Sequence, residues 1–169
     1  MIIDKYKTIF IHIPKNAGTS VKDFFNRDRD KFFIPSVKIQ KHDTIYQIKH
    51  KVPELYNSFK KFAIVRNPYD RALSWYIYLK NKQNRFKKWI KNPTHKLEPQ
   101  YTWVDDTVKI IKFENLNKEI NEFFNKKIDL PIMNKSNHEN YLKYYDQKSL
   151  DIVYNRYKKD FEKFNYKKL

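Results

Sequence analysis

The stretch Ile9-Phe-Ile-His-Ile-Pro-Lys-Asn-Ala-Gly-Thr-Ser20 contains the only glycine of the chain, Gly18. Its first residues, Ile9 to Ile13, predict a short buried strand, and Val21, Phe24 and Phe25 then recur at helical spacing. A glycine between a strand and a helix lets the backbone turn and approach an anion, and Lys15 adds a positive charge beside the start of the helix. We therefore predict that a phosphate-like group binds at this loop.

The same order of strand, loop and helix recurs along the chain. Residues 62–65 and 108–113 predict two further strands, and each is followed by apolar residues at helical spacing: Ala72, Leu73, Tyr76 and Leu79 after the first, and Leu116, Ile120, Phe123 and Phe124 after the second. A last helix is predicted by Leu150, Val153, Tyr154, Tyr157 and Phe161. Residues 84–106 lack clear periodicity and predict an irregular or partly helical excursion. The pattern predicts one α/β domain over residues 1–169, a parallel sheet flanked by helices with ligands at the carboxyl ends of the strands.

The composition limits the class of protein. A formal net charge of +17 favours anionic partners, but the lysines are spread over the whole chain, so most are expected to be solvated surface residues. The chain has no cysteine, and its five histidines show no metal-ligand spacing. The first strand begins almost at Met1 and no apolar run reaches the ~18 residues that span a bilayer, so we expect a soluble, cytoplasmic protein without a signal peptide or membrane anchor.

The glycine loop differs from a Walker A loop, because its lysine precedes the glycine by three residues. Lys-Asn-Ala-Gly-Thr-Ser after a strand instead resembles the 5′-phosphosulfate-binding loop of sulfotransferases, which use 3′-phosphoadenosine 5′-phosphosulfate (PAPS). The resemblance implies that Lys15 neutralises charge on the leaving phosphate. It also implies that five residues cradle the phosphosulfate, mostly through backbone N–H groups: Asn16, Ala17, Gly18, Thr19 and Ser20. The alternative is a plain strand-to-helix turn in which a hydroxyl caps the helix.

The segment Phe62-Ala-Ile-Val-Arg-Asn-Pro-Tyr-Asp-Arg-Ala-Leu-Ser-Trp-Tyr76 resembles the 3′-phosphate-binding segment of the same family. The resemblance assigns the 3′-phosphate to Arg66 and Ser74, and a guanidinium that forks onto phosphate oxygens suits that role. Further stretches resemble the carbohydrate-type, family 2-like branch: Lys41-His-Asp-Thr44, Phe113-Glu-Asn-Leu116, Leu130-Pro-Ile-Met-Asn-Lys-Ser136, and residues 154–166. Together they imply a P-loop-like sulfotransferase fold.

Several single residues remain to be assigned. His42 matches the family's Lys-His-x-Thr piece and is the candidate base, because a neutral imidazole accepts a hydroxyl proton at physiological pH. Ser136 resembles a residue of a loop that closes near the nucleotide, although an ordinary turn has the same sequence. His12, inside the predicted strand and beside the glycine loop, is expected to be a buried, hydrogen-bonded residue. Trp89 and Trp103 are candidates for stacking on sugars or for ordinary packing.

The sequence thus predicts an enzyme that moves the sulfuryl group of PAPS to an acceptor hydroxyl, most simply on a carbohydrate. The products would be the sulfated acceptor and adenosine 3′,5′-bisphosphate (PAP), with no metal, no specific nucleic acid and no defined oligomeric state. Two alternatives stay open. One is a nucleic-acid-binding protein whose two loops contact backbone phosphates, and the other is a P-loop-type nucleotide-binding protein or phosphotransferase that uses ATP.

Overall fold

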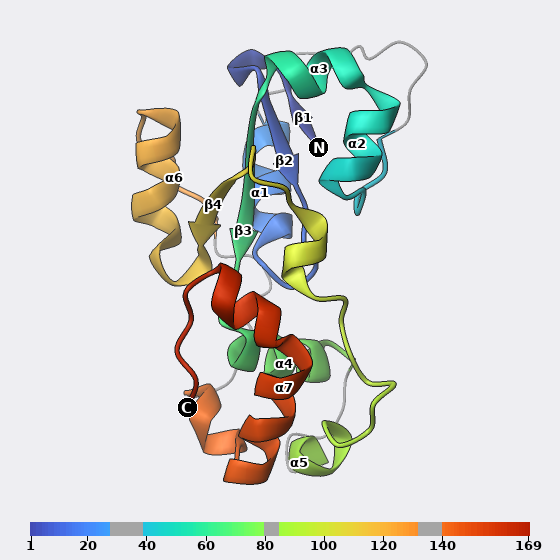
Figure 1. Cartoon of the computed structure of the whole chain (residues 1–169). Helices are drawn as coiled ribbons and strands as arrows, with labels where there is room; N and C mark the ends of the chain where they lie inside the picture. Colours follow the sequence, from blue (N-terminus) through green and yellow to red (C-terminus); the bar gives the residue numbers. More distant parts are fainter. Residues whose placement is uncertain (28–38, 80–84, 132–139) are drawn as a thin grey trace. The chain divides into compact units, whose positions relative to one another are not determined.

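The computed structural model describes residues 1–27, 39–79, 85–131 and 140–169. The chain forms two compact units (Figure 1). The first comprises Met1–Val65 and Thr102–Met133, and the second comprises Arg66–Tyr101 and Asn134–Leu169. That residues 1–169 act as a single domain stays a prediction.

The first unit contains a four-stranded sheet in the order β1-β2-β3-β4. Its strands are β1 (Ile2–Ile3), β2 (Thr8–Ile11), β3 (Lys60–Val65) and β4 (Lys109–Lys112). The last three are parallel, as predicted, with Ile11 opposite Ala63 and Val65 opposite Lys112. The prediction of a wholly parallel sheet is wrong for β1, which pairs with β2 in the antiparallel sense. The short 3-10 turn η1 (Asp4–Tyr6) reverses the chain between them, and so short a connection can join only antiparallel neighbours.

Helices flank this sheet. They are α1 (Gly18–Arg27), α2 (Ile45–Lys51), α3 (Pro53–Ser58) and α6 (Leu116–Phe124), which follows the 3-10 turn η4 (Phe113–Asn115). In the view of Figure 1, α6 lies on one side of the strands and α2 and α3 lie on the other. Helices α1 and α6 share one buried cluster with the strands: Ile3, Phe10, Val21, Phe25, Phe62, Ile64, Ile111, Ile120, Ile128 and Leu130.

The second unit is helical. It contains α4 (Pro68–Tyr78), α5 (Phe86–Trp89), the 3-10 turn η5 (Tyr141–Tyr144) and α7 (Gln147–Lys163). Helix α4 packs on α7, and the core between them is rich in aromatic residues: Tyr69, Ala72, Leu73, Tyr76, Phe86, Ile90, Tyr145, Val153, Tyr157 and Phe161. Leu79, predicted on the apolar side of α4, follows the helix as its C-cap and is exposed.

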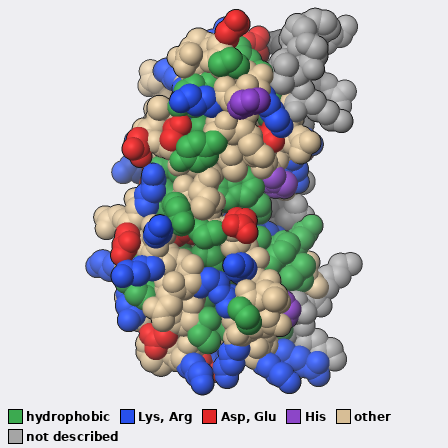
Figure 2. Space-filling view, turned by 45° about the vertical axis from the view of Figure 1, so that its right-hand side comes forward, with side chains coloured by type: hydrophobic (Ala, Val, Ile, Leu, Met, Phe, Trp, Pro, Cys, Tyr) green, Lys and Arg blue, Asp and Glu red, His purple; other side chains and the backbone are tan. Residues whose placement is uncertain are grey.

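The predicted excursion over residues 84–106 is confirmed as mostly irregular. Its regular parts are α5 and the 3-10 turn η3 (Gln100–Trp103). Figure 2 shows Lys and Arg side chains scattered over the visible face, which agrees with their spread along the sequence. Of the helices in the described part of the chain, none has the length and apolar character needed to span a bilayer.

Candidate functional site

The loop after β2 has an unusual backbone. Lys15 and Ala17 both adopt the left-handed conformation, with φ angles of 71° and 58°. Such a conformation costs a residue with a Cβ atom about 1–3 kcal/mol, and it persists where the surroundings hold it in place. Asn16 supplies one such restraint, because its Nδ2 donates to the carbonyl of Ile64 in β3 at 2.7 Å and its side chain is buried. The loop is therefore fixed at the carboxyl end of the parallel strands.

Gly18 serves a different purpose from the one that the sequence suggested. We expected the glycine to provide the turn, but its φ angle is not positive, and Lys15 and Ala17 make the turn instead. A Cβ atom on Gly18 would lie 1.9 Å from Nε2 of His12. The glycine is thus required because the His12 imidazole packs directly against its Cα atom.

Gly18, Thr19 and Ser20 form the first turn of α1. The first N–H groups of a helix have no acceptor within the helix, and together with the helix dipole they favour an anion. No acidic residue occupies this turn, so no side chain of the turn offsets its positive end. Thr19 is exposed and Ser20 is buried, so the two predicted hydroxyl ligands differ in their access to solvent.

His42 lies against His12, the residue that packs on Gly18 in the loop after β2. Its Nδ1 is 3.0 Å from the carbonyl oxygen of His12, and the two imidazole rings are 4.7 Å apart. A carbonyl oxygen can only accept, so Nδ1 of His42 carries the hydrogen and Nε2 of the neutral ring keeps its lone pair. His42 is also exposed, as a base that meets an incoming substrate must be.

The expected burial of His12 is confirmed, although His12 follows β2 and does not lie within the strand. That its side chain is hydrogen-bonded stays a prediction. Burial, with smaller contributions from the neighbouring His42 and Lys41, lowers the pKa of His12 from 6.5 to about 3. His12 is therefore neutral at physiological pH. A neutral His12 ring adds no charge to the loop after β2 or to the neighbouring His42 ring.

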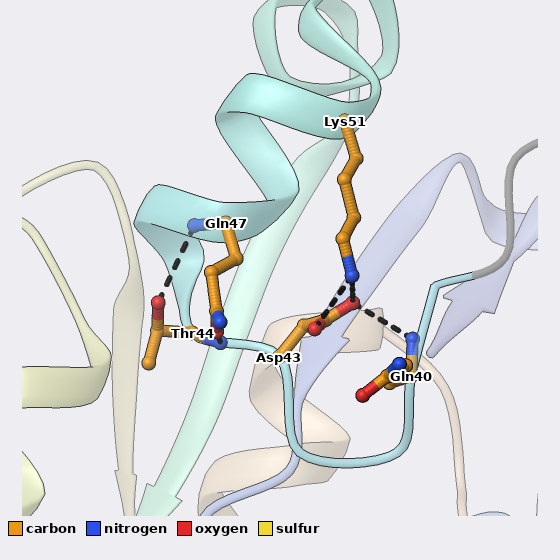
Figure 3. A network of polar contacts seen from close by, with 5 residues as sticks. All are labelled: Gln40, Asp43, Thr44, Gln47 and Lys51. Atoms are coloured by element: carbon orange, nitrogen blue, oxygen red, sulfur yellow. Dashed lines mark hydrogen bonds and ion pairs between the residues drawn. The ribbon is translucent and has the colours of Figure 1, made fainter.

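A network of polar contacts fixes the segment that carries His42 (Figure 3). The buried carboxylate of Asp43 accepts from Lys51 Nζ at 2.7 and 2.8 Å and from the Gln40 backbone N–H at 2.7 Å. Thr44 then starts α2 with a capping box, in which its side chain accepts from Gln47 N and the Gln47 side chain accepts from Thr44 N. His42 thus sits in a turn that is fixed on both sides.

The second predicted ligand segment begins the second unit. Arg66 follows β3 directly in the chain, and both Arg66 and Ser74 are buried, at 7% and 4% exposed. The Nε atom of Arg66 pairs with Asp70 Oδ2 at 2.7 Å, four residues along, which fixes the plane of the guanidinium. Helix α4 starts between Arg66 and Asp70, with the Asn67 side chain as its N-cap and Pro68 in its first turn.

A second buried arginine, Arg71 of α4, has surroundings that support a structural role. It is buried and donates to the carbonyl of Glu98 at 2.9 Å. Burial lowers its pKa to about 10, which leaves it charged at neutral pH, and Tyr157, Asp160 and Glu98 oppose that shift. It ties α4 to the irregular segment before η3.

The two candidate tryptophans have different surroundings. Trp89 stacks on His95 with ring centroids 5.0 Å apart and also contacts Tyr76, so it is a packing residue of the second unit. Trp103 is largely buried in the first unit, with its ring 6.2 Å from that of His42. The predicted ligand Ser136 lies outside the described residues. Within the described ranges, no group of three His, Cys, Asp or Glu residues could hold a metal ion.

Sequence reasoning missed several residues that support this machinery. Asp70 could have been found, since it stands four residues after Arg66 at the start of a helix, where opposite charges pair. Gln100 and Asp160 gave no local signal, because their partners lie 34 and 60 residues away along the chain.

Comparison with known proteins bears on the first two thirds of the chain. A sequence model described as the sulfotransferase family matches residues 1–117 of the 169, a range that includes both predicted ligand segments and His42. No curated protein and no solved structure matches the chain.

Proposed function

Because the chain belongs to the sulfotransferase family, we propose that it transfers the sulfuryl group of PAPS to a hydroxyl of a carbohydrate acceptor. The observation that carries this proposal is the contact made by His12. Its ring packs on Gly18 of the anion loop and on the ring of His42, and its carbonyl orients His42. One buried residue thus joins the proposed phosphosulfate loop to the proposed base.

The 5′-phosphosulfate is assigned to the loop after β2. Residues 16–20 would surround it with backbone N–H groups and the hydroxyls of Thr19 and Ser20, and Lys15 would lie beside the phosphate that leaves. Strain at Lys15 and Ala17 supports this assignment, since left-handed residues of this kind cluster at ligand-binding sites. The loop would then be shaped before the nucleotide arrives, which reduces the cost of binding.

His42 is assigned as the base. The acceptor oxygen forms a bond to sulfur while the bond from sulfur to the bridging phosphate oxygen breaks. The acceptor proton passes to Nε2 of His42, and the electron pair of the broken bond stays on the phosphate of PAP, whose charge Lys15 offsets. No covalent intermediate with the protein is needed.

The 3′-phosphate is assigned to Arg66 and Ser74 of the second unit, and Ser136 is retained as a further nucleotide ligand from the sequence alone. We assign one nucleotide to both the loop after β2 and the segment after β3 because the two motifs resemble those of the family. The P-loop-like character of the fold is proposed on the same basis.

Thermal-shift measurements with PAP, AMP and ATP at about 150 mM salt test the proposal. A ligand at ~100 times its dissociation constant stabilises a protein by roughly 2.7 kcal/mol. We expect a clear shift with PAP and much smaller shifts with AMP and ATP. The PAP shift should be lost in Arg66→Ala and retained in Arg85→Ala, which removes an exposed arginine of the same unit.

Two outcomes would contradict the proposal. Equal shifts with all three nucleotides would favour a general nucleotide-binding protein, especially if the ATP shift requires Mg²⁺. No shift with PAP, together with nucleic-acid affinity that falls steeply with salt, would favour the nucleic-acid alternative.

A further inference from the structure

The side chain of Gln100 binds both the N–H and the carbonyl group of Arg66. Arg66 N–H donates to Gln100 Oε1 at 2.9 Å, and Gln100 Nε2 donates to the Arg66 carbonyl, also at 2.9 Å. The carboxamide thus pairs with Arg66 as a residue of a neighbouring strand would. Since β3 ends at Val65 and Arg66 is buried, these peptide groups need partners that the strand pairing does not supply.

Gln100 is in turn fixed by helix α7. The carboxylate of Asp160 accepts from Gln100 N–H and from Tyr101 N–H, each at 2.8 Å. Gln100 and Asp160 are both 0% exposed, so neither contact exchanges readily with water. Burial raises the pKa of Asp160, and the two N–H groups and Arg71 oppose that shift. A chain of hydrogen bonds therefore runs from Asp160 through Gln100 to the backbone of Arg66.

Arg66 is consequently held at two points. Gln100 fixes its backbone, and Asp70 fixes its side chain through Nε at 2.7 Å. A guanidinium binds phosphate best as a two-pronged fork through its terminal nitrogen atoms, and that geometry tolerates little displacement. A ligand group that is misplaced by about 1 Å can lose up to about 100-fold of its effect.

We propose that Gln100, held by Asp160, is a positioning residue for Arg66 and so sets the selectivity of the protein for a 3′-phosphate. This inference rests on the proposed function, in which Arg66 binds that phosphate. Without the carboxamide, the buried N–H and carbonyl of Arg66 would lose these two hydrogen bonds, and Arg66 would shift from its position. The 5′ part of the nucleotide, assigned to another loop, would be unaffected.

The chain offers a matched control for this proposal. The hydroxyl of Tyr157 binds the backbone of Leu97 in the same way, accepting from its N–H at 3.1 Å and lying 3.3 Å from its carbonyl. Tyr157 is also buried and also ties the irregular segment before η3 to α7, but its hydroxyl is bound to Leu97 and not to Arg66. Gln100→Met and Tyr157→Phe therefore each remove a buried polar group that binds the backbone of one residue twice.

The experiment compares dissociation constants for PAP and AMP by calorimetry at about 150 mM salt. In Gln100→Met we expect the PAP constant to rise about 10-fold and the AMP constant to change less than about 2-fold. Tyr157→Phe should keep the wild-type ratio of the two constants. Asp160→Asn, which keeps one acceptor oxygen, should lower the preference for PAP by about 3-fold, and it gives a second reading if Gln100→Met does not fold.

A wild-type ratio in Gln100→Met, or in Asp160→Asn if that variant alone folds, would overturn the positioning role while leaving the proposed function intact. An equal loss of preference in Tyr157→Phe would also overturn it, because general loosening of the segment would then explain the effect. If the wild-type protein shows no preference for PAP over AMP, the role of Arg66 and this inference fall together.

Discussion

The loop after β2 and the segment after β3 both connect a buried strand to a helix, yet they are held in different ways. The first is shaped by its backbone, with Lys15 and Ala17 in the left-handed conformation and Gly18 against the His12 ring. The second is shaped by side chains from elsewhere in its unit, with Arg66 bound by Asp70 and Gln100. A site built from the backbone suits a ligand group that is surrounded by N–H groups. A site built from fixed side chains suits a single charged group that must be bound in one geometry.

The comparison also predicts how substitutions affect each segment. The loop after β2 should be destabilised by added side-chain volume at Gly18 and should respond to the conformational preference of single residues. The segment after β3 should lose ligand selectivity before stability, because its strand and helix remain intact when one hydrogen bond is removed.

The largest effect is expected from Gly18→Ala. The new methyl group would overlap the His12 ring, which is also held by Phe10 and His42, so we expect the free energy of unfolding to fall by about 3 kcal/mol. Urea denaturation measures this loss. The neighbouring exposed variant Thr19→Ala should change it by less than about 0.5 kcal/mol.

A double-mutant cycle identifies the cause of that loss. In the His12→Ala background, Gly18→Ala should cost at least about 1 kcal/mol less than in the wild type, because the ring it would strike is gone. Purely additive costs would show that the glycine is required for some other reason.

The second effect concerns acid stability. The pKa of His12 is about 3 in the folded protein against 6.5 in a model peptide, so the unfolded chain binds the extra proton first. Above pH 6.5 His12 does not lower the free energy of unfolding. As the pH falls from 6.5 toward 3, the free energy of unfolding decreases by about 1.4 kcal/mol per pH unit, which amounts to about 2 kcal/mol at pH 5. His12→Phe should remove this part of the pH dependence in denaturation curves. An unchanged slope in that variant would show that His12 is not held neutral.

The smallest effect tests backbone strain. Ala17→Gly should raise the free energy of unfolding by up to about 1 kcal/mol, because glycine adopts the left-handed conformation without a steric penalty. Ala72→Gly, in the interior of α4, should instead lower it by about 1 kcal/mol. If both variants are destabilised equally, Ala17 does not hold a left-handed conformation in solution.

The sequence predicted the α/β class, three strands, the main helices and the position of the two strand-to-helix segments, because hydrophobic periodicity and loop residues are local signals. That these segments bind a ligand stays a prediction. It missed β1, whose two residues are too few for any pattern. It placed Gly18 correctly but gave the wrong reason, since the contact with His12 depends on the path of the chain and not on residue type. Gln100 and Asp160 could not be found at all, because their partners lie 34 and 60 residues away along the chain.

The central claim is tested most directly by PAP release from PAPS in the presence of a pool of carbohydrate polymers, measured for the wild-type protein and for His42→Ala alongside their dissociation constants for PAP. We predict that His42→Ala binds PAP within about 2-fold of the wild type but releases it at a rate reduced by about 10²–10⁴. Equal rates of PAP release from the two proteins would contradict His42 as the base. A wild-type protein that neither binds PAP nor consumes PAPS would contradict the account as a whole.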